Sequence, residues 1–261
     1  MTQADLSGLT IGVLGGTGPQ GRGLAYRWAL GGLSVLIGSR DVDRAEHTAA
    51  SLRERAGSRR VRGTDNAGCA AESDLVVVAV PFDGHAALLT SLRAPLAGTI
   101  VIDCVNPLGF DSQGPYPRAV PEGSAAQQAQ ALLGESRVTA AFHHVSAVLL
   151  EDPEVSSLDI DVLVLGDDQE ATDLVCALAE VLPGARGIYG GRLRNAGQVE
   201  ALTANLIAIN RRYHTHAGIR ITGLIPASSP TGRLRSPRPV PPAPGEPTSH
   251  ELLDAEREER L

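Results

Sequence analysis

The sequence predicts an α/β fold in which helices cover a mostly parallel sheet. Three observations support this prediction: short apolar segments alternate with stretches of helical period, most of these segments are continuously apolar, and a glycine-rich loop follows the first of them. The chain has 261 residues, of which 43% are hydrophobic and 20% are charged. These values suit a soluble globular protein that buries a continuous core.

The amino-terminal half contains apolar segments with helical stretches between them. Asp41 precedes one amphipathic stretch and is its predicted N-cap. The predicted strands are residues 9–14 (LTIGVL), 33–37 (LSVLI), a weak strand at Val61, 75–80 (LVVVAV) and 99–105 (TIVIDCV), and the predicted helices are 24–30, 41–56 and 83–92. Strands and helices that alternate in this way predict βαβ units.

The carboxy-terminal half continues the pattern after a Gly/Pro-rich loop at 108–123. It predicts helices at 125–133, 169–182 and 197–218, and strands at 138–142, 160–165 and 187–189. In the last helix, Leu202, Leu206, Ile209 and Tyr213 share one face. From residue 225 on, the proline-rich composition predicts a disordered extension, and Thr248 and Glu251 match a capping box.

The glycine-rich loop predicts a dinucleotide site. Gly16-Thr17-Gly18-Pro19-Gln20-Gly21 fits the G-x-G-x-x-G pattern directly after a strand and before a helix. In this pattern Gly16 permits the tight turn, Gly18 lets the backbone approach a pyrophosphate, and Gly21 lets helix and strand pack closely. Pro19 is tolerated at the helix start, where its missing N–H has no intrahelical partner. The fold class expected is therefore a Rossmann-type, doubly wound parallel sheet.

The end of the second predicted strand favours NADP over NAD. NAD-binding domains usually place an acidic residue there to bind the ribose 2′-hydroxyl. This chain instead has Ser39 and Arg40, with Arg44 one helical turn further on. A hydroxyl and two guanidinium groups would bind a 2′-phosphate through charge-assisted hydrogen bonds, which a carboxylate would oppose.

Composition excludes several classes of function. A formal net charge of −7 argues against a nucleic-acid binder, and no apolar stretch is long enough to span a membrane. All 23 Lys+Arg positions are arginine, so mechanisms that need a lysine are excluded. The three separated cysteines, Cys69, Cys104 and Cys176, predict neither a metal site nor disulfides and suit a reducing cytoplasm. The start, MTQADLSG, does not resemble a secretory signal.

Histidines are the remaining candidates for acid or base chemistry. His143 and His144 follow a predicted strand, where α/β sheets present ligand-binding groups, and His214 and His216 are further candidates. His47, His85 and His250 are expected to be ordinary helix or tail residues. Hydride exchange between two bound redox coenzymes needs little from the protein beyond alignment of the rings and exclusion of water. A strong predicted NADP site in a chain without any lysine for acid or base catalysis therefore points to hydride exchange between two coenzymes.

Four segments resemble the coenzyme F420-dependent NADP reductases: GGTGPQGRGLA, GSRDVDRAE, VVVAVPF and NAGQVEALTANLIAINRRY. The resemblance implies residues 1–145 as an NADP-binding Rossmann domain and 146–224 as a smaller α/β domain that completes the deazaflavin site and forms a possible dimer interface. Residues 225–261, the proline-rich tail, have no family counterpart.

The resemblance also implies roles for particular residues. Thr17, Gly18, Pro19 and Gln20 would contact the pyrophosphate, Ser39, Arg40 and Arg44 the 2′-phosphate, and Val80, Pro81 and Ala147 the nicotinamide region. His143 is the candidate catalytic residue and would contact the deazaflavin. Arg44 replaces a lysine frequent in the family. The His143–Ala147 segment departs from the family where proline often precedes the alanine.

The implied activity is direct hydride transfer between NADP(H) and coenzyme F420 by a cytoplasmic homodimer. Two other interpretations stay open. The chain could be an NADPH-dependent reductase of another acceptor, such as a flavin, a ferric chelate or an imine. It could also be a non-catalytic NADP-binding sensor that docks partners through its tail.

Overall fold

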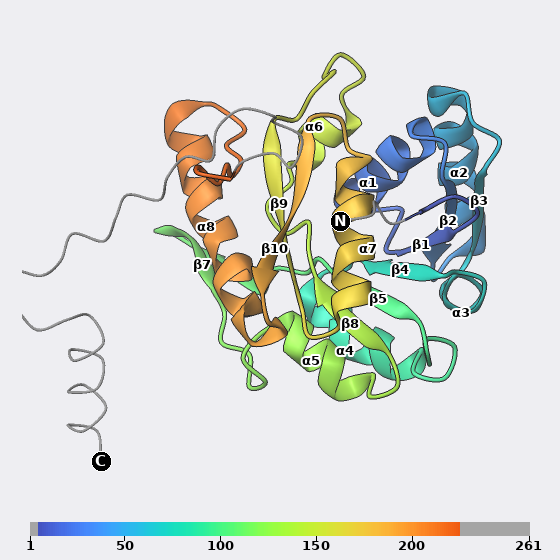
Figure 1. Ribbon diagram of the computed structural model, residues 1–261, viewed down its shortest axis with the longest axis horizontal. Helices are drawn as coiled ribbons and strands as arrows, with labels where there is room; N and C mark the ends of the chain where they lie inside the picture. Colours follow the sequence, from blue (N-terminus) through green and yellow to red (C-terminus); the bar gives the residue numbers. More distant parts are fainter. Residues whose placement is uncertain (1–4, 225–261) are drawn as a thin grey trace, which may run out of the picture. The chain divides into compact units, whose positions relative to one another are not determined.

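A computed structural model describes residues 5–224 and contains one large sheet with helices on both faces (Figure 1). The strand order is β10-β9-β8-β5-β4-β1-β2-β3, and every neighbouring pair is parallel except β8 and β9. The strands are β1 (Thr10–Leu14), β2 (Ser34–Ser39), β3 (Val61–Asp65), β4 (Leu75–Val78), β5 (Ile100–Asp103), β8 (Arg137–Ala140), β9 (Ile160–Gly166) and β10 (Ala185–Gly191). The predicted Rossmann-type α/β class is confirmed.

The helices divide between the two faces of this sheet. They are α1 (Pro19–Leu30), α2 (Val42–Ala56), α3 (Asn66–Ala71), α4 (Phe82–Ser91), α5 (Ala125–Leu132), α6 (Ala147–Glu151), α7 (Gln169–Glu180) and α8 (Ala196–Tyr213), with a short 3-10 turn at Leu193–Asn195. One apolar cluster packs α1, α2, α6 and α7 on the sheet, and another packs α3, α4, α5 and α8 on the opposite face.

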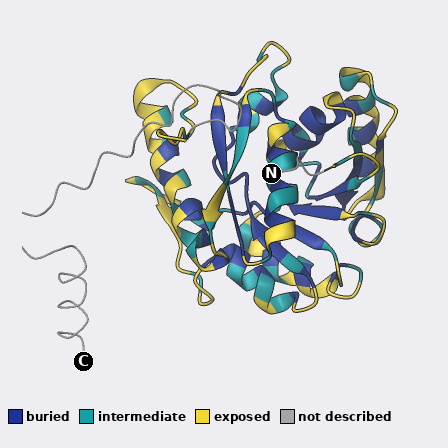
Figure 2. Ribbon diagram, viewed as in Figure 1, coloured by how far each residue is buried: buried dark blue, intermediate teal, exposed yellow. Residues whose placement is uncertain are grey.

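The strand sequences explain why both faces are covered. In β4, Leu75 and Val77 belong to one cluster while Val76 and Val78 belong to the other. Successive side chains of a strand point to opposite faces, so a continuously apolar strand needs apolar partners on both. Figure 2 shows the central strands buried and the exposed residues on the outer sides of the helices.

Two segments differ from the sequence prediction. Residues 108–123, predicted as a loop, contain an antiparallel hairpin of β6 (Leu108–Asp111) and β7 (Gly114–Pro117), which turns at Gly114 with a φ of 124°. The last helix ends at Tyr213 rather than near 218, because His214 adopts the left-handed conformation, with a φ of 52°. The side chain of Asn210 then accepts a hydrogen bond from the Ala217 N–H at 2.6 Å and holds the reversed chain.

The described residues on the two sides of the predicted boundary at 145/146 share one sheet. β9 pairs with β8 in the antiparallel sense, through Thr139 with Gly166 and Ala140 with Leu165, and so extends the first sheet. The division into an NADP-binding domain and a smaller second domain stays a prediction. The predicted disordered tail and its capping box fall at 225–261 and lie outside the described residues.

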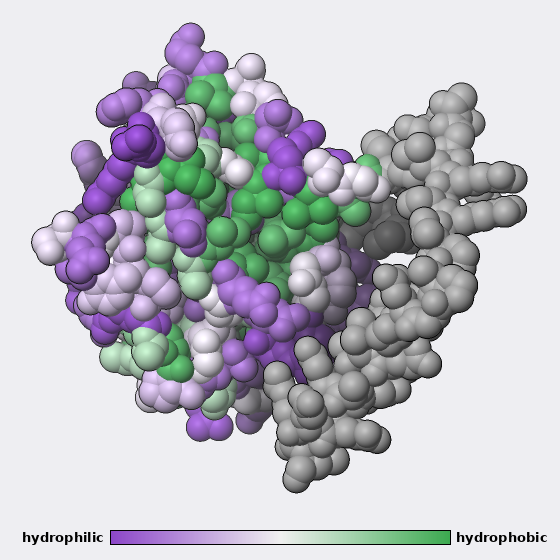
Figure 3. Space-filling model, turned by 90° about the vertical axis from the view of Figure 1, so that its left-hand side faces the viewer, coloured by the Kyte–Doolittle hydropathy of each residue, from purple (hydrophilic) through white to green (hydrophobic). Residues whose placement is uncertain are grey.

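An apolar surface covers the face formed by α8 and the β6–β7 hairpin. Figure 3 views this face and shows hydrophobic side chains gathered over it. Exposed apolar residues here are Phe110, Tyr116, Leu202, Ile209 and Tyr213. Leu206, from the same predicted helix stripe, packs inside the subunit instead. Among the described helices, none has the length and apolar character needed to cross a membrane.

Close packing of α7 on β10 depends on Gly187. A Cβ at this position would overlap the backbone of Cys176 in α7, and backbone atoms cannot move aside locally. We expect Gly187→Ala to lower the free energy of unfolding by about 2 kcal/mol through overpacking, as measured by urea denaturation. Gly190→Ala in the same strand is the matched control, because its Cβ would find its nearest neighbours at 3.4 Å. Equal stability of the two variants would contradict this account.

Candidate functional site

The loops that carry the predicted site residues meet at one edge of the sheet. β1, β4, β5 and β8 are parallel and therefore end at the same edge, where open α/β sheets bind ligands. Because β9 is antiparallel to β8, the start of β9 also lies there. Residues 15–18, 79–81, 104–106 and 141–146 form the loops of this edge.

The glycine loop is folded tightly between β1 and α1. Gly15 has a φ of 77°, and a Cβ there would lie 2.5 Å from the carbonyl oxygen of Ala79. The position that needs positive φ is thus Gly15, one residue before the predicted Gly16. A Cβ on Gly21 would lie 2.8 Å from the carbonyl oxygen of Gly15, which confirms that the first turn of α1 packs closely on the loop.

The amino-terminus of α1 suits an anion. No side chain caps this helix at Gly18, and Pro19 occupies its first position. Side chains cap the helices that begin after Asp41, Asp65 and Ser124, whereas α4, α6 and α8 also lack such a cap. The backbone N–H groups at the start of α1 thus face the site without a competing cap, which is the arrangement that binds a phosphate.

The predicted 2′-phosphate residues lie together at the end of β2. Ser39 is 9% exposed, and its hydroxyl accepts a hydrogen bond from the Asp41 N–H at 3.2 Å. Asp41 caps α2 through the Arg44 N–H, as predicted. Arg40 and Arg44 are exposed. Within residues 5–224, neither guanidinium forms an ion pair with a carboxylate, so both can bind an added anion.

The residues predicted for the nicotinamide region flank the same loops. Val80 packs against the glycine loop, since its Cγ1 lies 2.8 Å from where a Gly15 Cβ would be. Pro81 stands at the N-cap of α4, and Ala147 begins α6. The Gln20 side chain donates to the carbonyl oxygen of Phe142 at 3.3 Å. The glycine loop and the loop after β8 are therefore in direct contact.

His143 is buried without a partner for its ring. The residue is 4% exposed, and neither ring nitrogen has a hydrogen-bond partner. Burial and, to a smaller extent, the neighbouring His144 lower the pKa of His143 to about 4, although the charge of Asp103 opposes them. The ring is therefore neutral at pH 7. His144 differs, because its Nε2 donates to the carbonyl oxygen of Asp161 at 2.7 Å.

The other two candidate histidines lie nearer the surface. His214 forms the left-handed C-cap of α8, and His216 contacts the Ser146 hydroxyl through its Nδ1 at 3.4 Å. His216 thus lies beside the loop after β8, whereas His214 serves to end a helix.

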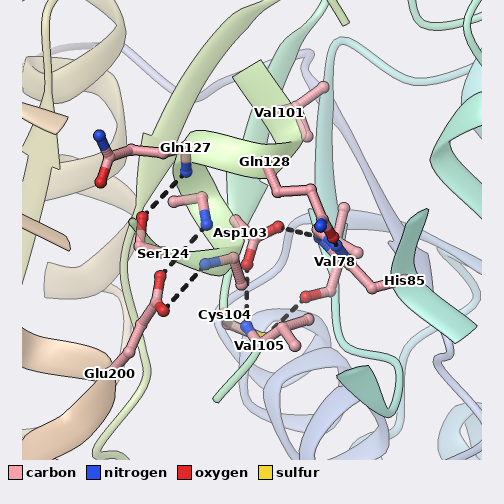
Figure 4. Close-up of polar contacts among 12 residues, drawn as sticks. Val78, His85, Val101, Asp103, Cys104, Val105, Ser124, Gln127, Gln128 and Glu200 are labelled. Carbon is pink, nitrogen blue, oxygen red and sulfur yellow. Dashed lines mark hydrogen bonds and ion pairs between the residues drawn. The ribbon is translucent and has the colours of Figure 1, made fainter. Parts of the chain in front are cut away.

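A buried polar network behind the site was missed by sequence reasoning. His85, predicted as an ordinary helix residue, is 0% exposed and bonds Asp103 through Nε2 at 2.6 Å and Gln128 through Nδ1 at 3.0 Å. Figure 4 shows these side chains pointing toward one another. Burial opposes protonation, but the hydrogen bond and charge of Asp103 outweigh it and raise the pKa of His85. Asp103 also accepts the Val105 N–H at 3.0 Å. Its position in an otherwise apolar strand is the one sequence feature that marks the network.

Glu200 connects α8 to the same region. It is 2% exposed, and its carboxylate accepts the N–H groups of Ala125 and Ala126 at the start of α5, at 2.9 and 3.2 Å (Figure 4). Burial raises the pKa of Glu200 to about 7, against the two N–H donors. In the part of the chain that the structure describes, no group of three or more His, Cys, Asp or Glu could hold a metal ion.

Comparison with known proteins agrees with this geometry. The family described as NADP oxidoreductase, coenzyme F420-dependent, matches residues 10–107. The F420-dependent NADP reductase of Methanothermobacter thermautotrophicus is 41% identical over 224 residues, which cover 83% of this chain and 96% of the relative. That of Methanocaldococcus jannaschii is 37% identical and covers 83% and 99%. The chain belongs to the F420-dependent NADP reductase family.

A solved structure has a similar fold over most of this chain. It comes from Arthrobacter sp. FB24, was proposed to be an F420-dependent NADP reductase, and superposes with a TM-score of 0.70 at 30% identity. It covers 82% of this chain and 99% of its own.

Proposed function

We propose that this chain transfers a hydride directly between NADP(H) and coenzyme F420. The observation that supports this most strongly is the hydrogen bond from the Gln20 side chain to the Phe142 carbonyl oxygen. It joins the glycine loop, which leads into a helix without a side-chain cap, to the loop of the candidate deazaflavin site. The chain that contains both loops is a member of this family. Two ring systems bound on these adjacent loops could meet at one edge of the sheet.

The site residues divide the binding of NADP among three places. The N–H groups at the start of α1, with Gly16, Thr17, Gly18, Pro19, Gln20 and Gly21, would hold the pyrophosphate. Ser39, Arg40 and Arg44 would hold the 2′-phosphate, since both guanidinium groups are unpaired in the described chain. Val80, Pro81 and Ala147 would line the nicotinamide.

The chemistry then resides in the coenzymes, with hydride passing between nicotinamide C4 and deazaflavin C5. The protein holds the rings and excludes water. His143 serves as a neutral contact, because burial keeps its imidazole uncharged at pH 7. Its two nitrogens, one a donor and one an acceptor, have no partner among the described residues and would bind a polar ring edge once the loop gives access to them.

Mixing the purified protein with NADPH and oxidised F420 tests the proposal. We expect loss of the visible absorbance of the oxidised deazaflavin together with oxidation of NADPH in equal amounts. Flavin, ferric chelate and imine acceptors are assayed in parallel. If one of these acceptors is reduced faster than F420, that acceptor takes the place of F420 in the proposal. If NADPH binds but no acceptor is reduced, a non-catalytic sensor is favoured.

We further propose a cytoplasmic homodimer that buries the apolar face of α8 and the β6–β7 hairpin. Tyr213 is 71% exposed and Phe110 61% exposed, so a second copy would cover large apolar side chains. Three free cysteines suit a reducing compartment. Light scattering of the wild type and of Tyr213→Glu should give a dimer and a monomer, respectively. A monomeric wild type would rule the dimer out.

A further inference from the structure

Helix α4 is attached to the sheet through a buried polar side chain. Its two buried residues are His85 and Leu89, and His85 is 0% exposed. The His85 Nε2 lies 2.6 Å from the carboxylate of Asp103, at the end of β5, and the Nδ1 lies 3.0 Å from the side-chain oxygen of Gln128 on α5 (Figure 4). Removing charge from water is costly, so burial alone does not explain a histidine and an aspartate here.

The ring of His85 is held in one orientation by bonds to two different elements. Burial opposes protonation of this ring, but Asp103 and Gln128 outweigh it and raise its pKa, which favours the imidazolium. An imidazolium donates from both nitrogens, so it can bind the Asp103 carboxylate and the Gln128 oxygen together. The ring also stacks on Phe82, with centroids 6.1 Å apart. These contacts fix the first turn of α4 against β5 and α5.

The first turn of α4 continues directly from the loop that follows β4. Pro81 is the N-cap of α4 and lies about one helical turn before His85. The residues just before it pack on the glycine loop, since a Cβ on Gly15 would lie 2.5 Å from the Ala79 carbonyl oxygen and 2.8 Å from the Val80 Cγ1. The loop after β4 therefore has the glycine loop on one side and the anchored turn of α4 on the other.

We propose that His85 and Asp103 are positioning residues for the nicotinamide end of NADP(H), which hold the loop after β4 where it lines the nicotinamide ring. This inference rests on the proposed binding of NADP(H) and does not depend on which acceptor takes the hydride. The bonds of His85 run to β5 and α5 rather than to the glycine loop or the end of β2. Loss of the pair should therefore affect the nicotinamide and spare the phosphates.

Two ligands separate the ends of the coenzyme in the full-length protein: NADPH, and 2′-phospho-ADP-ribose, which lacks the nicotinamide. The main variant is the double substitution His85→Leu with Asp103→Asn. It removes the bond without leaving a buried charge unpaired, and the new amide oxygen can still accept the Val105 N–H. We expect the dissociation constant of NADPH to rise about fivefold or more, while that of 2′-phospho-ADP-ribose stays within about twofold.

Hydride transfer provides a second measurement. Single-turnover oxidation of bound NADPH, by F420 or by whichever acceptor is reduced fastest, should slow about tenfold or more in the double variant, since small misplacements of reacting groups are costly. His85→Gln keeps a side-chain donor for Asp103 and should be impaired less than the double variant.

Leu89→Ala is the matched control for general damage to α4. It opens a cavity under the same helix, one turn beyond His85, and should lower the urea midpoint. Because the polar bond stays intact, we expect this variant to keep the wild-type ratio of the two dissociation constants and the wild-type rate. A purely structural role of His85 would give the control and the double variant the same changes, which would overturn the proposal.

The outcomes separate the pair from the underlying function. A double variant that keeps the wild-type ratio of dissociation constants and the wild-type rate would overturn the positioning role and leave the proposed function standing. A wild type that binds NADPH but does not reduce F420 would overturn the F420 activity alone, since the ratio of dissociation constants still tests the pair. A wild type that binds neither NADPH nor 2′-phospho-ADP-ribose would overturn both.

Discussion

Ser39→Asp should lower the affinity for NADPH about a hundredfold while NADH binding is kept. Ser39 is nearly buried at the end of β2, and its oxygen accepts the Asp41 N–H, a hydrogen bond that an aspartate oxygen can replace. The new carboxylate would face the 2′-phosphate, and such like-charge contact costs about 3 kcal/mol. For NADH, the same carboxylate meets a ribose hydroxyl, which it can accept as a hydrogen-bond donor.

Titration of both coenzymes by calorimetry measures this change. Arg40→Ala is the companion variant. It removes one charge-assisted hydrogen bond and should lower the affinity for NADPH about tenfold or somewhat more. Asp43→Asn, in the same first turn of α2, is the matched control for altered charge near the site and should leave the NADPH preference intact. Ser39→Asp with unchanged NADPH affinity would show that the 2′-phosphate binds elsewhere.

His143→Leu should change how stability depends on pH. The ordinary pKa of 6.5 applies in the unfolded chain, while burial lowers the folded value to about 4. The unfolded state therefore binds more protons between these values, so His143 costs the wild type no stability above pH 6.5. As the pH falls from 7 to 4.5, we expect the wild type to lose about 2–3 kcal/mol that the variant keeps.

At pH 7 the variant should be at least as stable as the wild type, because leucine has a similar volume and leaves no unpartnered buried nitrogen. Urea unfolding of both proteins at pH 7 and at pH 4.5 measures their stability at neutral pH and the loss of stability at low pH. The same variant should bind F420 more weakly and reduce it more slowly, since the proposed polar contact is lost. Parallel loss of stability in both proteins at low pH would assign the protons to another group, and full turnover would remove His143 from the site.

The sequence predicts the parts of this fold that depend on neighbouring residues. The apolar runs of β1, β2, β4 and β5 and the glycines of the phosphate loop are local features with a local physical cause. The Asp41 cap and the Ser39–Arg40 pair are of the same kind. The strands and the Asp41 cap were predicted correctly because a few adjacent residues determine the conformation. In the glycine loop the positive φ falls on Gly15 rather than Gly16, and the binding roles of Ser39 and Arg40 stay predictions.

What escapes prediction depends on partners far along the chain. Thr203 and Asn106 bind a carbonyl that lies 60 and 37 residues away, and Gln20 reaches across 122 residues. No local pattern distinguishes these side chains from ordinary polar residues. The position of β9 has the same cause, because pairing with the distant β8 decides whether β9 extends the first sheet or begins another.

The antiparallel strand β9 has a consequence for how coenzymes enter and leave. A protein built as two separate lobes would open and close about a hinge between them, and turnover would wait for that movement. Here strands before and after residue 145 belong to a single hydrogen-bonded sheet. We therefore expect the coenzymes to enter and leave without a hinge motion across residue 145. Solvent viscosity should then affect diffusion of the coenzymes rather than a large motion of the protein.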